Sequence, residues 1–309
     1  MVDWTLRLAA WITDKTNPPV ESVPPVRARA QLRTLTQTLG RLLMAAGPAS
    51  IVAEDRVLGG VSCRVYRPSV RRELMPAVIY FHGGGWVVGD LDTHDGVCRC
   101  LAQATQAIVI AVNYRLAPES AFPAAYDDAL AVTQAVMQQA AALGVRGESI
   151  AVAGDSAGGN LAAAVALHAR DQKWRVAAQL LIYPVLDTAA EAASYERFAT
   201  GHFLTREAMR YYIRCYLPQP TDRLRPQASP LRAPSLLGVA PALVITAEAD
   251  VLRDEALAYI AALRRDGVPA EHLDAAGMLH GFYNLLRLPT PRRVFDESAQ
   301  WLAKRISQD

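Results

Sequence analysis

Hydrophobic residues in this chain follow two periods, one typical of strands and one of helices, and the two alternate from about residue 51 onward. Residues 77–81 are apolar without a break, as expected for a strand buried on both faces. Further strands are predicted at 107–112, 149–153, 176–182 and 242–246, with a short last strand at 270–273. Helical spacing occurs between them, at 124–142, 160–167, 253–265 and 292–306. This alternation predicts an α/β fold with a mostly parallel sheet and helices on both faces.

The sheet is predicted to begin with a hairpin. Strand-like residues at 52–58 and 61–66 flank Gly59-Gly60, and glycine supplies the positive φ angles that a tight hairpin turn needs. All 309 residues are expected to form a single domain, because α/β folds of this length are often one unit.

Two regions depart from the alternation, residues 1–46 and about 188–234. The first has two apolar helical repeats divided by prolines: Trp4, Leu8, Trp11 and Ile12, then Leu32, Leu35, Leu39, Leu42 and Leu43, with Pro18, Pro19, Pro24 and Pro25 between them. The second is rich in aromatic residues and has helical spacing over 205–217 but no strand pattern. Because α/β enzymes place caps in long excursions after a strand, the second region is a predicted cap. The first is either a packing arm or part of the same lid.

Charge and composition argue against several classes of protein. The net charge is +2 with no long run of one sign, which does not support binding to nucleic acid or electrostatic attachment to membranes. No stretch reaches transmembrane length without charge, and the N-terminus lacks the pattern of a secretory signal. The four cysteines (Cys63, Cys98, Cys100 and Cys215) have no metal-binding arrangement. We expect them to be free thiols in a reducing compartment, the cytoplasm.

The sequence Gly154-Asp155-Ser156-Ala157-Gly158 lies between a predicted strand and a predicted helix. A serine at the apex of so sharp a turn needs small neighbours, which these glycines and Ala157 provide. The hydroxyl of Ser156 would then stand above the sheet edge, at the positive end of the following helix. The stretch therefore matches a nucleophile elbow, and the serine needs a base and an orienting acid.

The base and the acid are expected after the serine in the sequence, with the acid first. Two histidines qualify. His280 is expected in a loop after the last strand, whereas His272 lies on an alternating strand and is expected to be a surface residue. Asp250 follows the strand at 242–246 closely and is the predicted acid, with Glu248 as second choice. Asp254 and Glu255 are interpreted as acidic residues that stabilise a helix start.

The reaction of a serine nucleophile also creates an oxyanion, which needs preorganised N–H donors. His82-Gly83-Gly84-Gly85-Trp86 directly follows a buried strand, and its glycines can aim N–H groups inward without obstruction. The N–H of Ala157 is the expected second source. A phosphate-binding loop is excluded because the lysine and the serine or threonine of a Walker loop do not follow the glycines.

With these residues placed, the sequence closely resembles the bacterial hormone-sensitive-lipase-like (family IV) carboxylesterases of the α/β-hydrolase superfamily. The matching motifs, in family order, are His82-Gly83-Gly84-Gly85-Trp86, the residues from Tyr114 to Glu119, Phe122-Pro123-Ala124, the residues from Gly154 to Asn160, the residues from Asp250 to Glu255, and His280-Gly281-Phe282. The resemblance implies an eight-stranded α/β-hydrolase sheet and a helical cap formed by residues 1–46 and about 188–234.

The resemblance also implies roles for particular residues. Ser156 would be the nucleophile, His280 the base and Asp250 the acid, and the oxyanion donors would be Gly84, Gly85 and Ala157. We further expect Trp86, Phe203 and Leu204 to bind the substrate. The implied substrate is a small ester with a short to medium acyl chain, hydrolysed without a metal or organic cofactor. A homodimer is expected from the family and from the edge position of the last strand.

Three alternatives stay open at this point. A triad of this kind also acts on lactone, thioester or amide bonds, which pass through similar tetrahedral intermediates. The cap aromatics would suit an interfacial lipase if they formed a surface patch. A non-catalytic ligand receptor on the same fold is the third alternative, and the presence of serine, acid and histidine together argues against it.

Overall fold

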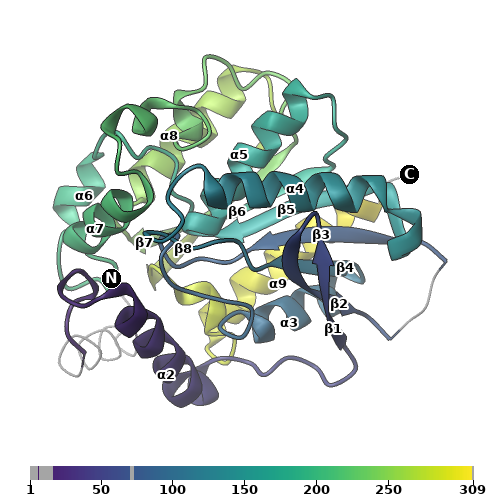
Figure 1. Ribbon diagram of the computed structural model, residues 1–309, viewed down its shortest axis with the longest axis horizontal. Coiled ribbons are helices and arrows are strands. Elements are labelled where there is room, and N and C mark those ends of the chain that lie inside the picture. Colours follow the sequence, from purple (N-terminus) through teal and green to yellow (C-terminus); the bar gives the residue numbers. More distant parts are fainter. Residues whose placement is uncertain (1–5, 7–16, 70–72, 308–309) are drawn as a thin grey trace.

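An eight-stranded sheet forms the centre of the computed structural model, which describes residue 6 and the ranges 17–69 and 73–307 (Figure 1). The strand order is β1-β2-β4-β3-β5-β6-β7-β8. β2 is antiparallel to β1 and to β4, and all other neighbours are parallel. The strands are β1 (Val52–Leu58), β2 (Val61–Arg67), β3 (Met75–Phe81), β4 (Ile108–Val112), β5 (Val145–Asp155), β6 (Ala178–Ile182), β7 (Ala242–Ala249) and β8 (Ala270–Leu279). The predicted mostly parallel, eight-stranded sheet is confirmed.

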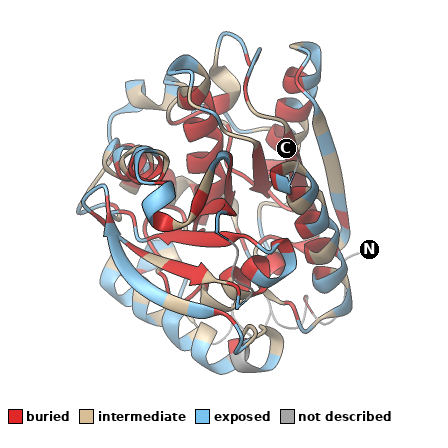
Figure 2. Cartoon of the chain, turned by 90° about the vertical axis from the view of Figure 1, so that its right-hand side faces the viewer, coloured by how far each residue is buried: buried red, intermediate tan, exposed pale blue. Residues whose placement is uncertain are grey.

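Helices cover both faces of this sheet. The main helices are α2 (Pro25–Leu43), α3 (Asp95–Thr105), α4 (Ala124–Gln138), α5 (Ala157–Asp171), α6 (Ala193–Arg197), α7 (Arg206–Tyr216), α8 (Arg253–Arg265) and α9 (Pro289–Ser307). One apolar cluster joins the sheet to α4, α5 and α8, and a second joins it to α3 and α9. Neighbouring residues of β3 point to opposite clusters, Ile79 to the first and Tyr80 to the second. Figure 2 shows the buried residues concentrated in the strands and on the inner sides of the helices.

The hairpin and most element positions agree with the sequence pattern, but several strands are longer than predicted, β5 and β8 the most. Leu58 pairs with Val61 across Gly59-Gly60, and both glycines have positive φ. β5 runs on to Asp155, and β8 to Leu279 instead of residue 273. The prediction for β8 was too short because the small residues after 273 interrupt the apolar alternation. Its backbone pairing with β7 continues nonetheless, through an irregularity between Ala247 and Ala249.

The two regions outside the alternation contain helices but no strand where the structure describes them. α2 begins at Pro25, whose fixed φ suits a first helical position. The repeat of Trp4, Leu8, Trp11 and Ile12 lies outside the described residues. Between β6 and β7 the chain forms α6, α7 and two short 3₁₀ turns, η3 (Pro220–Leu224) and η4 (Pro230–Arg232). Figure 1 places α2, α6 and α7 at the same end of the molecule. Among the described helices, none combines the length and the apolar character needed to cross a bilayer.

Candidate active site

Ser156 occupies the sharp turn between β5 and α5. Its backbone has φ 57° and ψ −119°, a conformation that costs energy for a residue with a side chain. There is no room for side chains at the surrounding glycines. A Cβ at Gly154 would collide with the carbonyl of Gly158, and a Cβ at Gly158 would collide with the carbonyl of Phe81. The turn is tied to its neighbours because the N–H of Ser156 donates to the carbonyl of Ile182 at 2.8 Å. The strand-turn-helix setting predicted for this serine is therefore present.

Asp250, His280 and Ser156 form one series of hydrogen bonds. The Nδ1 of His280 lies 2.7 Å from Oδ2 of Asp250, and its Nε2 lies 2.9 Å from Oγ of Ser156. An ionised carboxylate only accepts, so Nδ1 carries the proton and Nε2 faces the hydroxyl with its lone pair. Asp250 is fully buried, and its other oxygen accepts the N–H of Leu252 at 3.0 Å. The acid is thus fixed from both sides and holds the imidazole in one orientation.

Two neighbouring parallel strands bring the acid and the base together. Asp250 is the first residue after β7, and His280 is the first residue after β8. The competing residues point elsewhere. His272 lies within β8, where its Nε2 is 2.8 Å from Oγ1 of Thr246. Glu248 accepts the N–H of Gly277 at 2.7 Å.

The glycine-rich loop after β3 turns back on itself beside Ser156. Gly84 and Gly85 both have positive φ, 120° and 58°. The carbonyl of Gly84 accepts the N–H groups of Val87 at 3.0 Å and Val88 at 2.9 Å, which closes the turn. Within the described part of the chain, the N–H groups of Gly84, Gly85 and Ala157 have no protein acceptor. These three amides are therefore available to a ligand.

Asp155 anchors this loop, a role that sequence reasoning did not find. The carboxylate is buried and accepts the N–H of Gly83 at 3.0 Å and the hydroxyl of Tyr80 at 2.8 Å. His94 adds a third contact, with Nε2 3.3 Å from the carboxylate. Burial alone would raise the pKa of Asp155, but His94 and the hydrogen bonds lower it below the usual 3.8. Asp155, the residue before Ser156, thus holds the N–H of Gly83 in the glycine loop, and nothing in its spacing indicated this.

The three residues expected to bind substrate lie in different surroundings. The indole of Trp86 is fully buried and stacks on Tyr216, with ring centroids 4.5 Å apart, which argues against direct contact with a substrate. Leu204 is buried in the apolar cluster that packs against α5. Phe203 is 42% exposed, and its ring is beside Gly281, the residue after His280.

Two tyrosines near the site were not predicted. The ring of Tyr212, from α7, lies directly on Gly85, so that a Cβ at that glycine would collide with it. Tyr183 lies beside the imidazole of His280, with ring centroids 4.5 Å apart. The sequence pattern identified the aromatic residues of the 188–234 region but could not indicate which of them faces the glycine loop.

The described residues contain no group of three or more histidine, cysteine, aspartate or glutamate side chains that could hold a metal ion. The arrangement of Asp250, His280 and Ser156 needs no such ion to activate the hydroxyl, because the imidazole takes the proton directly. The geometry suits nucleophilic attack on an acyl group.

Comparison with known proteins gives concordant matches. The family described as alpha/beta hydrolase fold matches residues 78–284. An ethyl acetate hydrolase of Pseudomonas putida is 40% identical over 226 residues, 72% of this chain and 71% of that protein. Carboxylesterase NlhH of Mycobacterium tuberculosis is 40% identical over 266 residues, 83% of this chain and 82% of that protein. The crystal structure of a thermostable esterase from Pseudomonas putida superposes with a TM-score of 0.93 at 35% identity, covering 100% of this chain and 98% of that one.

Proposed function

This chain belongs to the hormone-sensitive-lipase-like family of the α/β-hydrolase superfamily, and we propose that it is a carboxylesterase acting on small esters with short to medium acyl chains. The observation that carries the proposal is the series of hydrogen bonds from Asp250 through His280 to Ser156. The relatives named as esterases support the same class of substrate. Ser156 is the proposed nucleophile, His280 the proposed general base and Asp250 the proposed orienting acid.

The proposed reaction has two halves. His280 takes the proton of Ser156 as Oγ forms a bond to the carbonyl carbon of the ester. The tetrahedral intermediate collapses when the bond to the alcohol oxygen breaks, and His280 gives its proton to the departing alcohol. Water then attacks the acyl-enzyme with His280 as base, which releases the acid and restores the serine hydroxyl.

The proposed oxyanion hole consists of the N–H groups of Gly84, Gly85 and Ala157. Its support is that these amides have no acceptor in the described part of the chain and lie on the turns beside Ser156. Donors fixed before the reaction stabilise the developing negative charge without reorganisation. We also propose that residues 1–46 and about 188–234 form the cap, and that Phe203 and Tyr212 border the entrance to the site.

A panel of p-nitrophenyl esters of increasing acyl length tests the activity, with Ser156→Ala as the control. The proposal predicts hydrolysis of the shorter esters and loss of nearly all turnover in the variant. Parallel thioester, lactone and anilide substrates distinguish an esterase from hydrolases of other acyl bonds. An emulsified long-chain triglyceride tests for an interfacial lipase. Normal ester turnover by the Ser156→Ala variant would contradict the proposed nucleophile.

Location and association are also proposals. The four cysteines are free thiols, which supports a reducing, cytoplasmic setting. The net charge of +2 supports a small-molecule partner in preference to nucleic acid. β8 lies at the edge of the sheet, which supports a homodimer formed by edge-to-edge pairing. Light scattering on the purified chain tests the last point, and a monomer would contradict it.

A further inference from the structure

Arg29, on α2, reaches the glycine-rich loop from a part of the chain that the catalytic residues do not use. Its Nε donates to the carbonyl of Val87 at 2.8 Å, and its Nη2 to the carbonyl of Ala117 at 2.9 Å. The same guanidinium pairs with both oxygens of Glu119, at 3.0 and 2.6 Å. The Arg29 side chain is 23% exposed, and its bonds to the two carbonyls are partly buried, whereas the pair with Glu119 is exposed. One side chain therefore joins α2 to two loops of the core.

The two loops are also bonded to each other at the same place. The N–H of Ala117 donates to the carbonyl of Trp86 at 2.8 Å. Arg29 therefore binds one carbonyl on each side of this contact: that of Val87, the residue after Trp86, and that of Ala117. The guanidinium beside Glu119 holds the pKa of that carboxyl below its usual 4.5, so the pair stays charged at neutral pH.

A short relay of peptide groups leads from Arg29 to a proposed oxyanion donor. Each peptide is planar with its C=O and N–H on opposite sides, so fixing one group orients the other. Arg29 holds the carbonyl of the peptide between Val87 and Val88. The N–H of that peptide, on Val88, donates to the carbonyl of Gly84 at 2.9 Å. The peptide that carries this carbonyl also carries the N–H of Gly85.

We propose that Arg29 is a positioning residue that orients the N–H of Gly85 through the turn at 84–88. This deepens the proposed esterase function and rests on it. The consequence is that α2, in the proposed cap, contributes to transition-state stabilisation without touching the substrate. A planar guanidinium suits this task because it donates to two carbonyls and one carboxylate in a fixed geometry, which an ammonium group cannot do.

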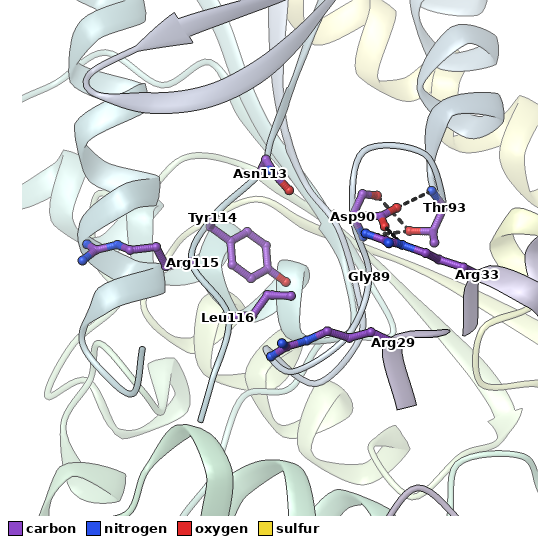
Figure 3. Close-up of a pocket in the computed structure, with 9 residues that line it drawn as sticks. All are labelled: Arg29, Arg33, Gly89, Asp90, Thr93, Asn113, Tyr114, Arg115 and Leu116. Carbon is purple, nitrogen blue, oxygen red and sulfur yellow. Dashed lines mark hydrogen bonds and ion pairs between the residues drawn. The ribbon is translucent and has the colours of Figure 1, made fainter. Parts of the chain in front are cut away.

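Arg33 provides a matched control on the same helix. It lies one turn further along α2, and its Nε pairs with Asp90 at 2.6 Å. Figure 3 shows Arg29 and Arg33 both reaching from α2, with Arg33 directed to Asp90. Both arginines line a cavity of about 330 Å³. Arg33 makes an exposed ion pair to the same loop but no bond to a carbonyl of the 84–88 turn. If loosening of α2 alone lowered the activity, Arg33→Gln would lower it too. If the bonds from Arg29 to the 84–88 turn are what matters, Arg33→Gln would leave the activity unchanged.

The test combines hydrolysis of p-nitrophenyl acetate with inhibition by a trifluoromethyl ketone. The ketone adds reversibly to Oγ of Ser156, whose proton passes to His280, and the resulting oxyanion needs the same N–H donors as the transition state. In Arg29→Gln, kcat/KM is expected to fall about tenfold and the ketone Ki to rise by about the same factor. The effect is smaller than that of deleting an oxyanion donor, about a hundredfold or more, because a displaced N–H still binds the oxyanion in part. Arg33→Gln should stay within about twofold on both measures.

The outcomes separate this proposal from the proposed function. A wild-type chain without esterase activity overturns the proposed function, and an active Ser156→Ala variant overturns the proposed nucleophile. An active wild type with Arg29→Gln unchanged in both measures overturns the relay. A loss of kcat/KM with an unchanged Ki also overturns it, because the substitution would then have lowered activity without affecting oxyanion binding. If Arg29→Gln does not fold, Arg29→Lys decides: a Ki raised about threefold supports the relay and an unchanged Ki overturns it.

Discussion

At the scale of single residues, the site depends on a few atoms held in place from more than one side. One carboxylate oxygen of Asp250 accepts a hydrogen bond from the N–H of Leu252, and the other accepts one from Nδ1 of His280. This leaves Nε2 of the imidazole as an acceptor for the proton of Ser156. In the proposed mechanism, Asp250 therefore acts by selecting a tautomer and stabilising the imidazolium, not by taking a proton itself.

The change Asp250→Asn tests this role. The amide of asparagine can donate to Nδ1, which places the imidazole proton on Nε2 and removes the base from the serine. We expect kcat for p-nitrophenyl acetate to fall by about 10⁴-fold with a nearly unchanged fold. Glu248→Gln, near the end of the same strand, is the control and should retain activity. A kcat within tenfold of wild type in Asp250→Asn would show that another residue orients the imidazole.

At the scale of elements, buried side chains tie helices to loops that are distant in sequence. Glu255, in the first turn of α8, is buried and accepts the N–H of Leu186 at 2.6 Å. Burial raises the pKa of Glu255 well above its usual 4.5, although its bonds to backbone N–H groups partly oppose this. The interpretation of Glu255 as a simple helix-start residue was therefore incomplete. Its carboxyl also anchors the chain that leaves β6.

Substitutions at Glu255 should show how much of its contribution to the free energy of unfolding comes from the hydrogen bond and how much from the carboxyl charge. Glu255→Ala leaves the N–H of Leu186 buried without an acceptor and should lower the free energy of unfolding by about 1–3 kcal/mol. Glu255→Gln retains an acceptor and should cost less than about 1 kcal/mol. Asp254→Ala, on the same turn but only half-buried, is the control. Urea denaturation measures all three, and equal losses in the alanine and glutamine variants would contradict the assignment.

The sequence allowed the elements to be predicted better than the contacts between them. Strand-helix alternation and the glycine pattern around Ser156 are local, so the sheet, the elbow and the order of serine, acid and histidine could be predicted. The bond from Arg29 to Glu119 spans 90 residues, and the one from Asp155 to Gly83 spans 72. Which arginine or aspartate makes such a bond depends on the packed fold. Periodicity could not have identified either.

At the scale of the whole molecule, a buried histidine links stability to pH. His82 is 3% exposed, its Nδ1 donates to the carbonyl of Gly83 at 2.8 Å, and its ring stacks on Tyr114. Burial, together with the nearby His94, lowers the pKa of His82 from 6.5 to about 4. Between these two pH values the unfolded chain binds a proton that the folded chain does not. Folding stability contributed by this group is therefore complete above about pH 6.5 and is lost as the pH falls toward 4.

The expected loss from His82 across that range is about 3 kcal/mol. Urea denaturation at a series of pH values measures it as a fall in the free energy of unfolding. In His82→Gln the group no longer titrates, so the curve between pH 6.5 and 4 should be shallower even if the variant starts less stable. Parallel curves for the two proteins would contradict the assignment.

Covalent labelling of Ser156 would show whether His280 activates this serine as a nucleophile. With diethyl p-nitrophenyl phosphate, Oγ of Ser156 should bond to phosphorus as p-nitrophenolate leaves and His280 takes the proton. We expect one phosphoryl group per chain, located on Ser156 by mass spectrometry, with one equivalent of p-nitrophenolate released. His280→Ala should label far more slowly. A label on another residue or no label at all would rule out Ser156 as the nucleophile, and equally fast labelling without His280 would rule out His280 as its base.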